Sequence, residues 1–209
     1  MSARTVSKGT ETRDAILSEG MRLASLKGLE GLTIGTLATE LGLSKSGLFA
    51  HFKSKEQLQV EVVERTSQLF IDAVVRPALK APRGLPRVEA IFENWLTWAS
   101  RPVLPGGCLF IQAAAEFDDR PGPVRDAIQA SQKAWIGTLE KAVGLAIFEG
   151  HLFSTTEPSQ VAFEIEGVLL ASQFADRLLN DPRTVERARS AFTAILARHG
   201  AHHPESKDR

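Results

Sequence analysis

The chain has 209 residues, of which 43% are hydrophobic, and its 25 basic side chains balance 25 acidic ones. This composition predicts a folded protein with a substantial core and excludes a chain that binds nucleic acid over its whole surface. No stretch approaches the roughly 20 apolar residues of a membrane span, and the N-terminus lacks the apolar segment of a signal peptide. We therefore expect a cytoplasmic protein with no membrane partner.

Apolar residues recur at helical spacing through nearly the whole chain, and little of it alternates as a strand would. This pattern predicts an all-α fold of about nine helices. The first helix is predicted to run from a cap at Thr10 to Lys27, and Gly28 stands where a helix C-terminal glycine belongs. Residues 1–9 are small and polar, which predicts a flexible arm.

Residues 33–52 have the spacing of a helix-turn-helix. Two short helices are predicted at 34–41 and 45–51, with Thr33 and Ser44 as their caps. Gly42 supplies the positive φ that the turn requires, and Leu43 is expected to fill the core. The positions predicted to face inward are Leu37, Ala38, Leu41, Leu48 and Phe52. Together these features predict a helix-turn-helix of the kind that binds DNA.

The outward side of the second short helix is small, polar or basic, which suits a DNA major groove. Its residues are Lys45, Ser46, Gly47, Ala50 and His51. Lys45, Ser46 and Lys55 lie at helix N-termini, where the dipole and the free N–H groups favour phosphate. Residues 1–55 carry eight basic and five acidic side chains, which agrees with a local role in DNA binding. The alternatives are an ordinary helical hairpin and an adaptor that binds protein through this surface.

The stretch TRDAILSEGMRLASLKGLEGLTIGTLATELGLSKSGLFAHFKSKEQL, within residues 10–58, resembles the N-terminal domain of the TetR family of bacterial regulators. The resemblance implies a repressor that binds a palindromic operator in double-stranded DNA as a homodimer and is released by a small-molecule effector, with no cofactor. It places the DNA contacts at Thr33, Gly35, Thr36, Lys45, Ser46, Gly47, Phe49, Ala50, His51 and Lys55. Phe49 stands where the family usually has tyrosine, and its ring cannot donate a hydrogen bond to phosphate.

The rest of the chain also reads as helical. Further helices are predicted at 55–75, 87–100, 108–117, 123–149, 158–179 and 182–199, the last with Asp181 as cap and Pro182 as first residue. We expect a DNA-binding domain at 10–55, a larger effector-binding and dimerisation domain at 56–200, and a tail at 201–209.

The last two helices carry apolar stripes at helical spacing, and the family resemblance implies that these helices form the dimer interface. The interface residues expected are Val161, Ile165, Val168, Leu169, Val185, Ala188, Phe192 and Ile195. The alternative is that part of these stripes packs into the core of their own chain.

Most aromatic residues lie between the predicted DNA-binding domain and the last helices, and such a section suits a pocket for an apolar effector. The lining residues expected are Phe70, Phe92, Trp95, Trp98, Cys108, Phe110, Gln112, Glu116, Trp135 and Phe174. Any one of these aromatic side chains is alternatively plain core.

Cys108 is the only cysteine, which excludes an internal disulfide and a thiolate-rich zinc site. It follows Gly106 and Gly107 at a predicted helix N-terminus, and this segment resembles a subgroup of the family that includes electrophile-sensing repressors. A thiol-based sensor is therefore an alternative to a ligand-released repressor, although a small buried thiol is commoner. A helical enzyme with Cys108 as nucleophile and His151 as base lacks any supporting motif, so we expect no enzyme and no metal site.

Overall fold

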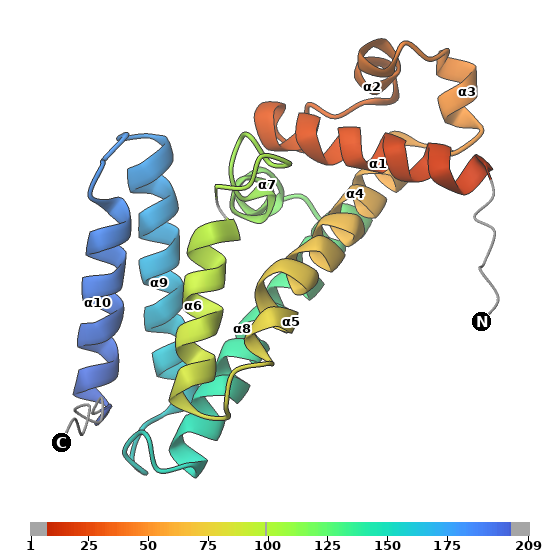
Figure 1. Cartoon of the computed structure of the whole chain (residues 1–209). Helices are drawn as coiled ribbons and strands as arrows, with labels where there is room; N and C mark the ends of the chain where they lie inside the picture. The colour runs from red at the N-terminus through yellow and green to blue at the C-terminus, as the bar shows by residue number, and fades with distance from the viewer. Residues whose placement is uncertain (1–7, 99, 202–209) are drawn as a thin grey trace. The chain divides into compact units, whose positions relative to one another are not determined.

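The computed structural model describes residues 8–98 and 100–201, and every regular element in these ranges is a helix (Figure 1). This confirms the predicted all-α fold. None of the helices in these ranges is long and apolar enough to cross a membrane. Most of the predicted arm, residues 1–7, and most of the predicted tail, residues 202–209, lie outside the described residues.

The helices follow one another with short connections. They are α1 (Lys8–Lys27), α2 (Ile34–Leu41), α3 (Lys45–Phe49), α4 (Lys55–Phe70), α5 (Arg76–Ala78), α6 (Leu85–Trp98), α7 (Leu109–Phe117), α8 (Pro123–Phe148), α9 (Pro158–Arg177) and α10 (Thr184–Arg198). A π-helical turn, η1 (Ile71–Val75), joins α4 to α5.

Several predicted helix ends differ from the structure by one or two residues; α6, for example, spans Leu85–Trp98 and not residues 87–100. Helix α1 begins at Lys8, so Thr10 lies inside it and does not cap it. Helix α3 ends at Phe49, because the His51 N–H bonds the Leu48 carbonyl in a tighter turn (2.9 Å). Helix α10 begins at Thr184, because the Thr184 N–H and hydroxyl both bond the Asp181 carbonyl and form a separate turn first.

The chain divides into two compact units. The first, which we call the reader unit, comprises residues 1–69 and 100–132; the second, the C-terminal unit, comprises residues 70–99 and 133–209. Helix α7 and the first part of α8 therefore fold with the helix-turn-helix. The functional boundary expected at residue 55 concerns DNA and effector binding and stays a prediction.

The core of the reader unit joins α1 and α4 to the two short helices. Leu37, Leu48, Phe52, Leu58 and Val62 are all buried. Burial of such side chains contributes roughly 1.5–3 kcal/mol each relative to exposure. The apolar side chains that recur at helical spacing in these segments thus pack into one shared core.

Arg13 of α1 closes this core at its edge. Its guanidinium lies over the Phe52 ring, 4.6 Å from the centroid, and donates to the His51 carbonyl (2.8 Å). It also forms an ion pair with Glu61 of α4. Arg13 therefore fixes α1 against the segment that joins α3 to α4.

The C-terminal unit is held by aromatic contacts between distant parts of the chain. Phe92 of α6 stacks on Phe192 of α10, with centroids 4.0 Å apart. Phe70 meets both Trp98 and Trp135 edge to face, at 5.3 and 5.0 Å. Such pairs contribute about 0.5–1.5 kcal/mol beyond the burial of their area.

Candidate nucleic-acid interface

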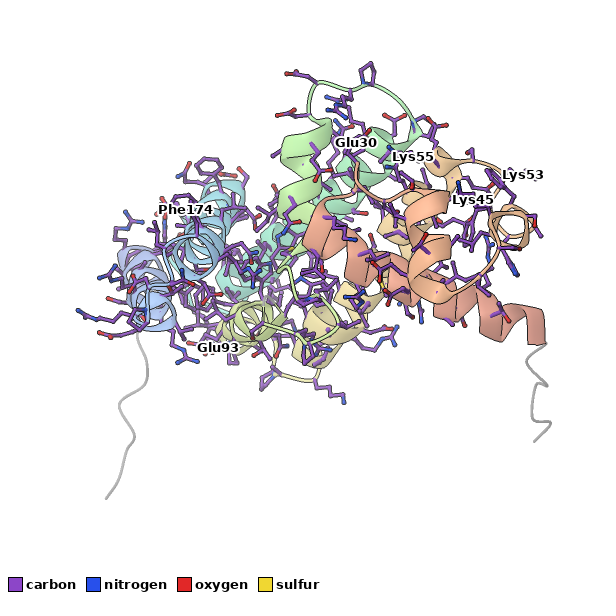
Figure 2. The ribbon with its side chains drawn as sticks, turned by 90° about the horizontal axis from the view of Figure 1, so that it is seen from above. Glu30, Lys45, Lys53, Lys55, Glu93 and Phe174 are labelled. Carbon is purple, nitrogen blue, oxygen red and sulfur yellow. The ribbon has the colours of Figure 1, made fainter. Side chains whose placement is uncertain are left out.

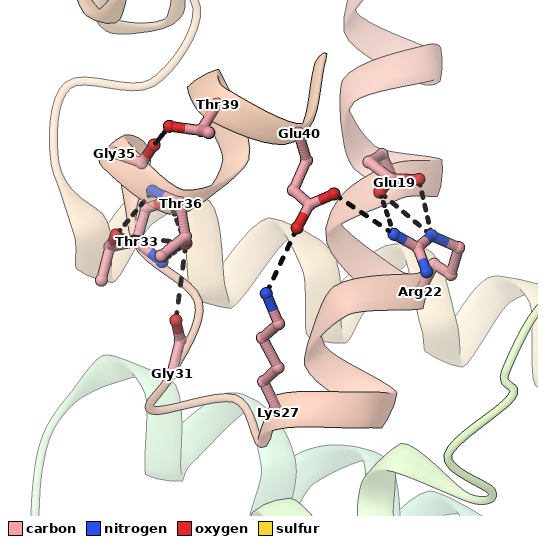
Figure 3. A network of polar contacts seen from close by, with 9 residues as sticks. All are labelled: Glu19, Arg22, Lys27, Gly31, Thr33, Gly35, Thr36, Thr39 and Glu40. Atoms are coloured by element: carbon pink, nitrogen blue, oxygen red, sulfur yellow. Dashed lines mark hydrogen bonds and ion pairs between the residues drawn. The ribbon is translucent and has the colours of Figure 1, made fainter. Parts of the chain in front are cut away.

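Helix α2 begins with a reciprocal pair of hydrogen bonds. The Thr36 N–H donates to Thr33 Oγ1 and the Thr33 N–H donates to Thr36 Oγ1, both at 3.0 Å. This capping box satisfies two N–H groups that the first helical turn would otherwise leave without partners. Figure 3 shows the pair at the start of α2. It confirms Thr33 as the cap.

The turn between α2 and α3 depends on Gly42, which has a φ of 64°. Its N–H bonds the carbonyls at the end of α2, and the Leu43 N–H bonds the Ala38 carbonyl at 2.9 Å. A side chain at Gly42 would meet nothing within 4 Å, so the backbone conformation, and not space, requires glycine here.

Leu43 is 43% exposed, so the prediction that it fills the core is wrong. The turn fixes its N–H on the end of α2 and leaves its side chain outside. Leu48 and Phe52, by contrast, are fully buried. Leu41 is half-buried.

Helix α3 presents the outward side that the sequence predicts. Ser44 caps it by accepting from the Gly47 N–H (3.0 Å). A Cβ at Gly47 would lie 3.2 Å from that hydroxyl, which is a tight contact. Five of the predicted contact residues are exposed and His51 is half-buried; the exposed ones are Lys45, Ser46, Gly47, Phe49 and Ala50.

Acidic groups behind α2 are neutralised by α1. Glu40 pairs with Lys27 at 3.2 Å and with Arg22 at 3.8 Å, and Glu19 pairs with the same arginine at 2.6 Å. Figure 3 shows these pairs on the side of α2 that faces α1. The two pairs of Glu40 join α2 to α1, whereas the pair of Glu19 with Arg22 lies within α1.

The start of α4 adds another positive side chain. Ser54 caps the helix by accepting from the Gln57 N–H (3.0 Å), and Lys55 follows as its first residue. The Lys55 ammonium donates to Glu30 Oε1 at 2.9 Å, and this bond is the main reason that the pKa of Glu30 lies below its ordinary value. Figure 2 shows Lys45, Lys53 and Lys55 at one end of the reader unit, with Glu30 beside Lys55.

Two residues expected in an effector pocket bond to protein groups within the reader unit. Glu116 accepts from the Glu30 N–H (2.7 Å), and Gln112 donates to the Gly106 carbonyl (2.7 Å). Gly28, with a φ of 79°, lies so close to Glu116 that a Cβ would come within 2.2 Å of the carboxylate. The glycine that ends α1 therefore also makes room for α7.

The other expected pocket residues do not all meet in one unit. Phe70, Trp98 and Trp135 form one cluster in the C-terminal unit, where Trp95 is also buried and Phe92 stacks elsewhere. Cys108 and Phe110 are buried in the reader unit. Phe174 is 55% exposed. A lining role for any of them stays a prediction, as does a sensing role for Cys108.

Glu166 is not among the site residues expected from the sequence, and two polar features of the C-terminal unit depend on the tertiary structure. The Trp135 indole N–H donates to Glu166 at 2.7 Å, and burial raises the pKa of that carboxyl. Trp98 Nε1 and Gln173 Oε1 are buried without a hydrogen-bond partner among the described residues. Glu166 and Gln173 lie seven positions apart on α9, a spacing of about two turns that places them on one helix face.

The expected dimer residues prove to be mostly internal to the C-terminal unit. Six of the eight are buried in the single chain: Val161, Ile165, Leu169, Ala188, Phe192 and Ile195. Val185 is 44% exposed and Val168 is half-buried. A different stripe is exposed, formed by Phe163, Leu170 and Phe174 of α9 and by Leu178, which follows the last residue of that helix. Its helical spacing is visible in the sequence but does not distinguish it from the buried stripe.

Two family models match this chain, and together they span most of its residues. Residues 84–192 match the tetracyclin repressor-like C-terminal domain, and residues 16–62 match the bacterial regulatory proteins of the tetR family. The chain belongs to the TetR family. It is therefore a DNA-binding transcriptional regulator rather than an enzyme, as the sequence predicts.

Other TetR proteins resemble it along nearly their whole length. The transcriptional repressor NemR of Escherichia coli strain K12 is 23% identical over 189 residues, which is 90% of this chain and 94% of NemR. A TetR regulator from Chloroflexus aurantiacus superposes with a TM-score of 0.80 at 24% identity, covering 91% of this chain and 94% of that one. AibR, solved with isovaleryl coenzyme A and operator DNA, has a TM-score of 0.72 at 22% identity and covers 88% and 97%.

Proposed function

We propose that this TetR regulator is a repressor that binds a palindromic operator as a homodimer and is released by a small-molecule effector. The observation that carries the proposal is the capped α2–turn–α3 arrangement with its exposed small and basic residues. The proposed DNA contacts are Thr33, Thr36, Lys45, Ser46, Gly47, Phe49, Ala50, His51 and Lys55. Binding to operator DNA would place the protein in the bacterial cytoplasm.

The chemistry of α3 favours close approach over extensive hydrogen bonding to bases. Gly47 and Ala50 lack long side chains, so the backbone can sit deep in the major groove. Phe49 offers an exposed apolar ring suited to a thymine methyl or a sugar, and not to a phosphate. Lys45 then supplies charge, and DNA shape contributes to the choice of sequence.

We propose that the partner is a second copy of the chain and that α9 and α10 form the contact. The exposed stripe Phe163, Leu170, Phe174 and Leu178 supports this. Beside it lies a groove of about 230 Å³ between α9 and α10, lined by small residues that include Ala171, Ala175 and Ala188. A two-fold axis would bring the stripe of each copy to the groove of the other copy. It would also place the two helix-turn-helix motifs on the two halves of a palindromic DNA site.

An effector is proposed to bind beside the aromatic cluster of the C-terminal unit. The relative AibR was solved with both a coenzyme A thioester and operator DNA, which supports response to a ligand. In this chain the rings of Phe70, Trp98 and Trp135 offer apolar surface, and Gln173 and Glu166 offer polar groups. An effector releases DNA only if it binds the two conformations of the regulator with different affinity.

The test begins with selection of DNA duplexes from a random library by the full-length protein. We expect enrichment of a palindrome, and two protomers per duplex by analytical ultracentrifugation. A folded protein that enriches no duplex at low salt would contradict the proposal. A thermal-shift screen of small molecules, followed by measurement of operator affinity, then tests release.

A further inference from the structure

One carboxylate, Glu30, holds two cationic side chains from segments far apart in the sequence. Lys55 at the start of α4 lies 2.9 Å from Glu30 Oε1, and Arg120 in the turn between α7 and α8 lies 3.4 Å from Glu30 Oε2. Both cations are reachable from solvent, with 37% of the Lys55 side chain and 57% of the Arg120 side chain exposed. Arg120 therefore lies next to a lysine proposed to contact DNA.

Arg120 is supported from both sides. Its guanidinium lies 5.7 Å from the centroid of the Phe117 ring at the end of α7. The backbone of Glu30 is in turn fixed by its N–H bond to Glu116 of the same helix, at 2.7 Å. The three charges thus occupy defined positions at the edge of a cleft of about 250 Å³, which Arg125 also lines.

We propose that Arg120 is a second contact to the DNA backbone beside Lys55, so that the DNA-binding surface extends from the helix-turn-helix to the α7–α8 turn. This inference rests on the proposed mode of DNA binding. Glu30 acts as a positioning residue, because its carboxylate orients both cations. Among the side chains that line the cleft, Lys55, Arg120 and Arg125 carry three positive charges against the two carboxylates of Glu30 and Glu56, so one positive charge remains. The remaining positive charge attracts phosphate, whose oxygens suit a guanidinium.

The inference predicts a change in the salt dependence of DNA binding. Each phosphate contact contributes a slope of about −0.9 to the plot of log affinity against log salt concentration. Arg120→Gln should make this slope shallower by about one and weaken binding equally on the selected duplex and on a scrambled duplex. Fluorescence anisotropy of labelled duplexes over a series of salt concentrations measures both quantities.

Arg183→Gln is the matched control, because Arg183 is an exposed arginine paired with Glu186 at 2.8 Å in the C-terminal unit. It should leave the slope unchanged. An unchanged slope for Arg120→Gln would overturn the inference while leaving the proposed function intact. A wild-type protein that binds no duplex at all would instead refute the proposed function.

Glu30→Gln separates a phosphate contact from a purely structural arginine. If Arg120 binds phosphate, removal of the Glu30 charge should tighten binding several-fold and steepen the slope. If Arg120 serves only to hold Glu30, both Arg120→Gln and Glu30→Gln should weaken binding to the same extent, and the inference fails. Thermal melting of each variant checks that the reader unit remains folded.

Discussion

The two compact units are specified by different kinds of interaction. In the reader unit, α2 and α3 begin and end through hydrogen bonds between residues three to five apart, such as Thr33 with Thr36 and Ser44 with Gly47. In the C-terminal unit, the defining contacts join residues far apart in the chain, such as Phe92 with Phe192. Local bonds shape the helix-turn-helix, whereas long-range packing decides which apolar residues of the other unit remain exposed.

The largest expected effect comes from removing one large core ring from each unit. Phe52→Ala and Phe92→Ala should each lower the free energy of unfolding by about 3–5 kcal/mol. Phe52→Ala should abolish DNA binding while the dimer persists, and Phe92→Ala should disrupt the dimer. Chemical denaturation, mobility shift and sedimentation measure the three properties. If each variant lost both DNA binding and dimerisation to the same extent, the two units would not unfold independently of each other.

The next effect concerns the exposed stripe of α9. Phe174→Glu should raise the dimer dissociation constant at least 30-fold, because a central aromatic residue in an interface often contributes about 2 kcal/mol or more. The unfolding of the isolated protomer should change little, since Phe174 is 55% exposed. Phe148→Glu is the control, because Phe148 is 80% exposed on α8. Sedimentation equilibrium decides, and a dimer unaffected by Phe174→Glu would place the interface elsewhere.

A smaller effect should follow from removal of the local cap of α3. Ser44→Ala removes the acceptor of the Gly47 N–H and should cost about 1 kcal/mol, with weaker operator binding. Ser190→Ala, at an exposed position of α10, should change neither property. Operator affinity that survives Ser44→Ala unchanged would mean that tertiary packing, and not the cap, holds α3.

The smallest effect is a pH dependence in the C-terminal unit. Burial raises the pKa of Glu166 above the ordinary value of 4.5, so the folded state binds more protons than the unfolded state above that pH. Stability from this group is therefore present at low pH and falls as pH rises through the folded pKa. Glu166→Gln should melt at an increasingly higher temperature than the wild type as pH rises. A difference in melting temperature that is constant with pH would contradict this.

The helix-turn-helix could be predicted from the sequence almost residue by residue. Thr33, Gly42 and Ser44 act through residues a few positions away in the chain, so their roles can be predicted from the sequence. One exception was the end of α3, which comes at Phe49 and not at residue 51. Leu43 was another, because the orientation of a side chain after a turn depends on the path of the backbone.

The exposed apolar stripe of α9 could not be predicted in this way. Helical spacing places Val161, Ile165 and Leu169 on one stripe of α9, and Phe163, Leu170 and Phe174 on another. Both stripes are apolar, so periodicity cannot say which is covered by the chain itself. The structure buries the first and exposes the second.

The sequence by itself therefore determined the helical fold and the caps of α2 and α3, because these depend on contacts within one or two helical turns. Only the tertiary structure decided that Glu30 joins Lys55 to Arg120 and that α7 folds with the reader unit. Charges 65 positions apart, as in Lys55 and Arg120, have no periodic signal in common. The two side chains come close together only because of how the helices pack, and a local sequence pattern gives no information on that packing.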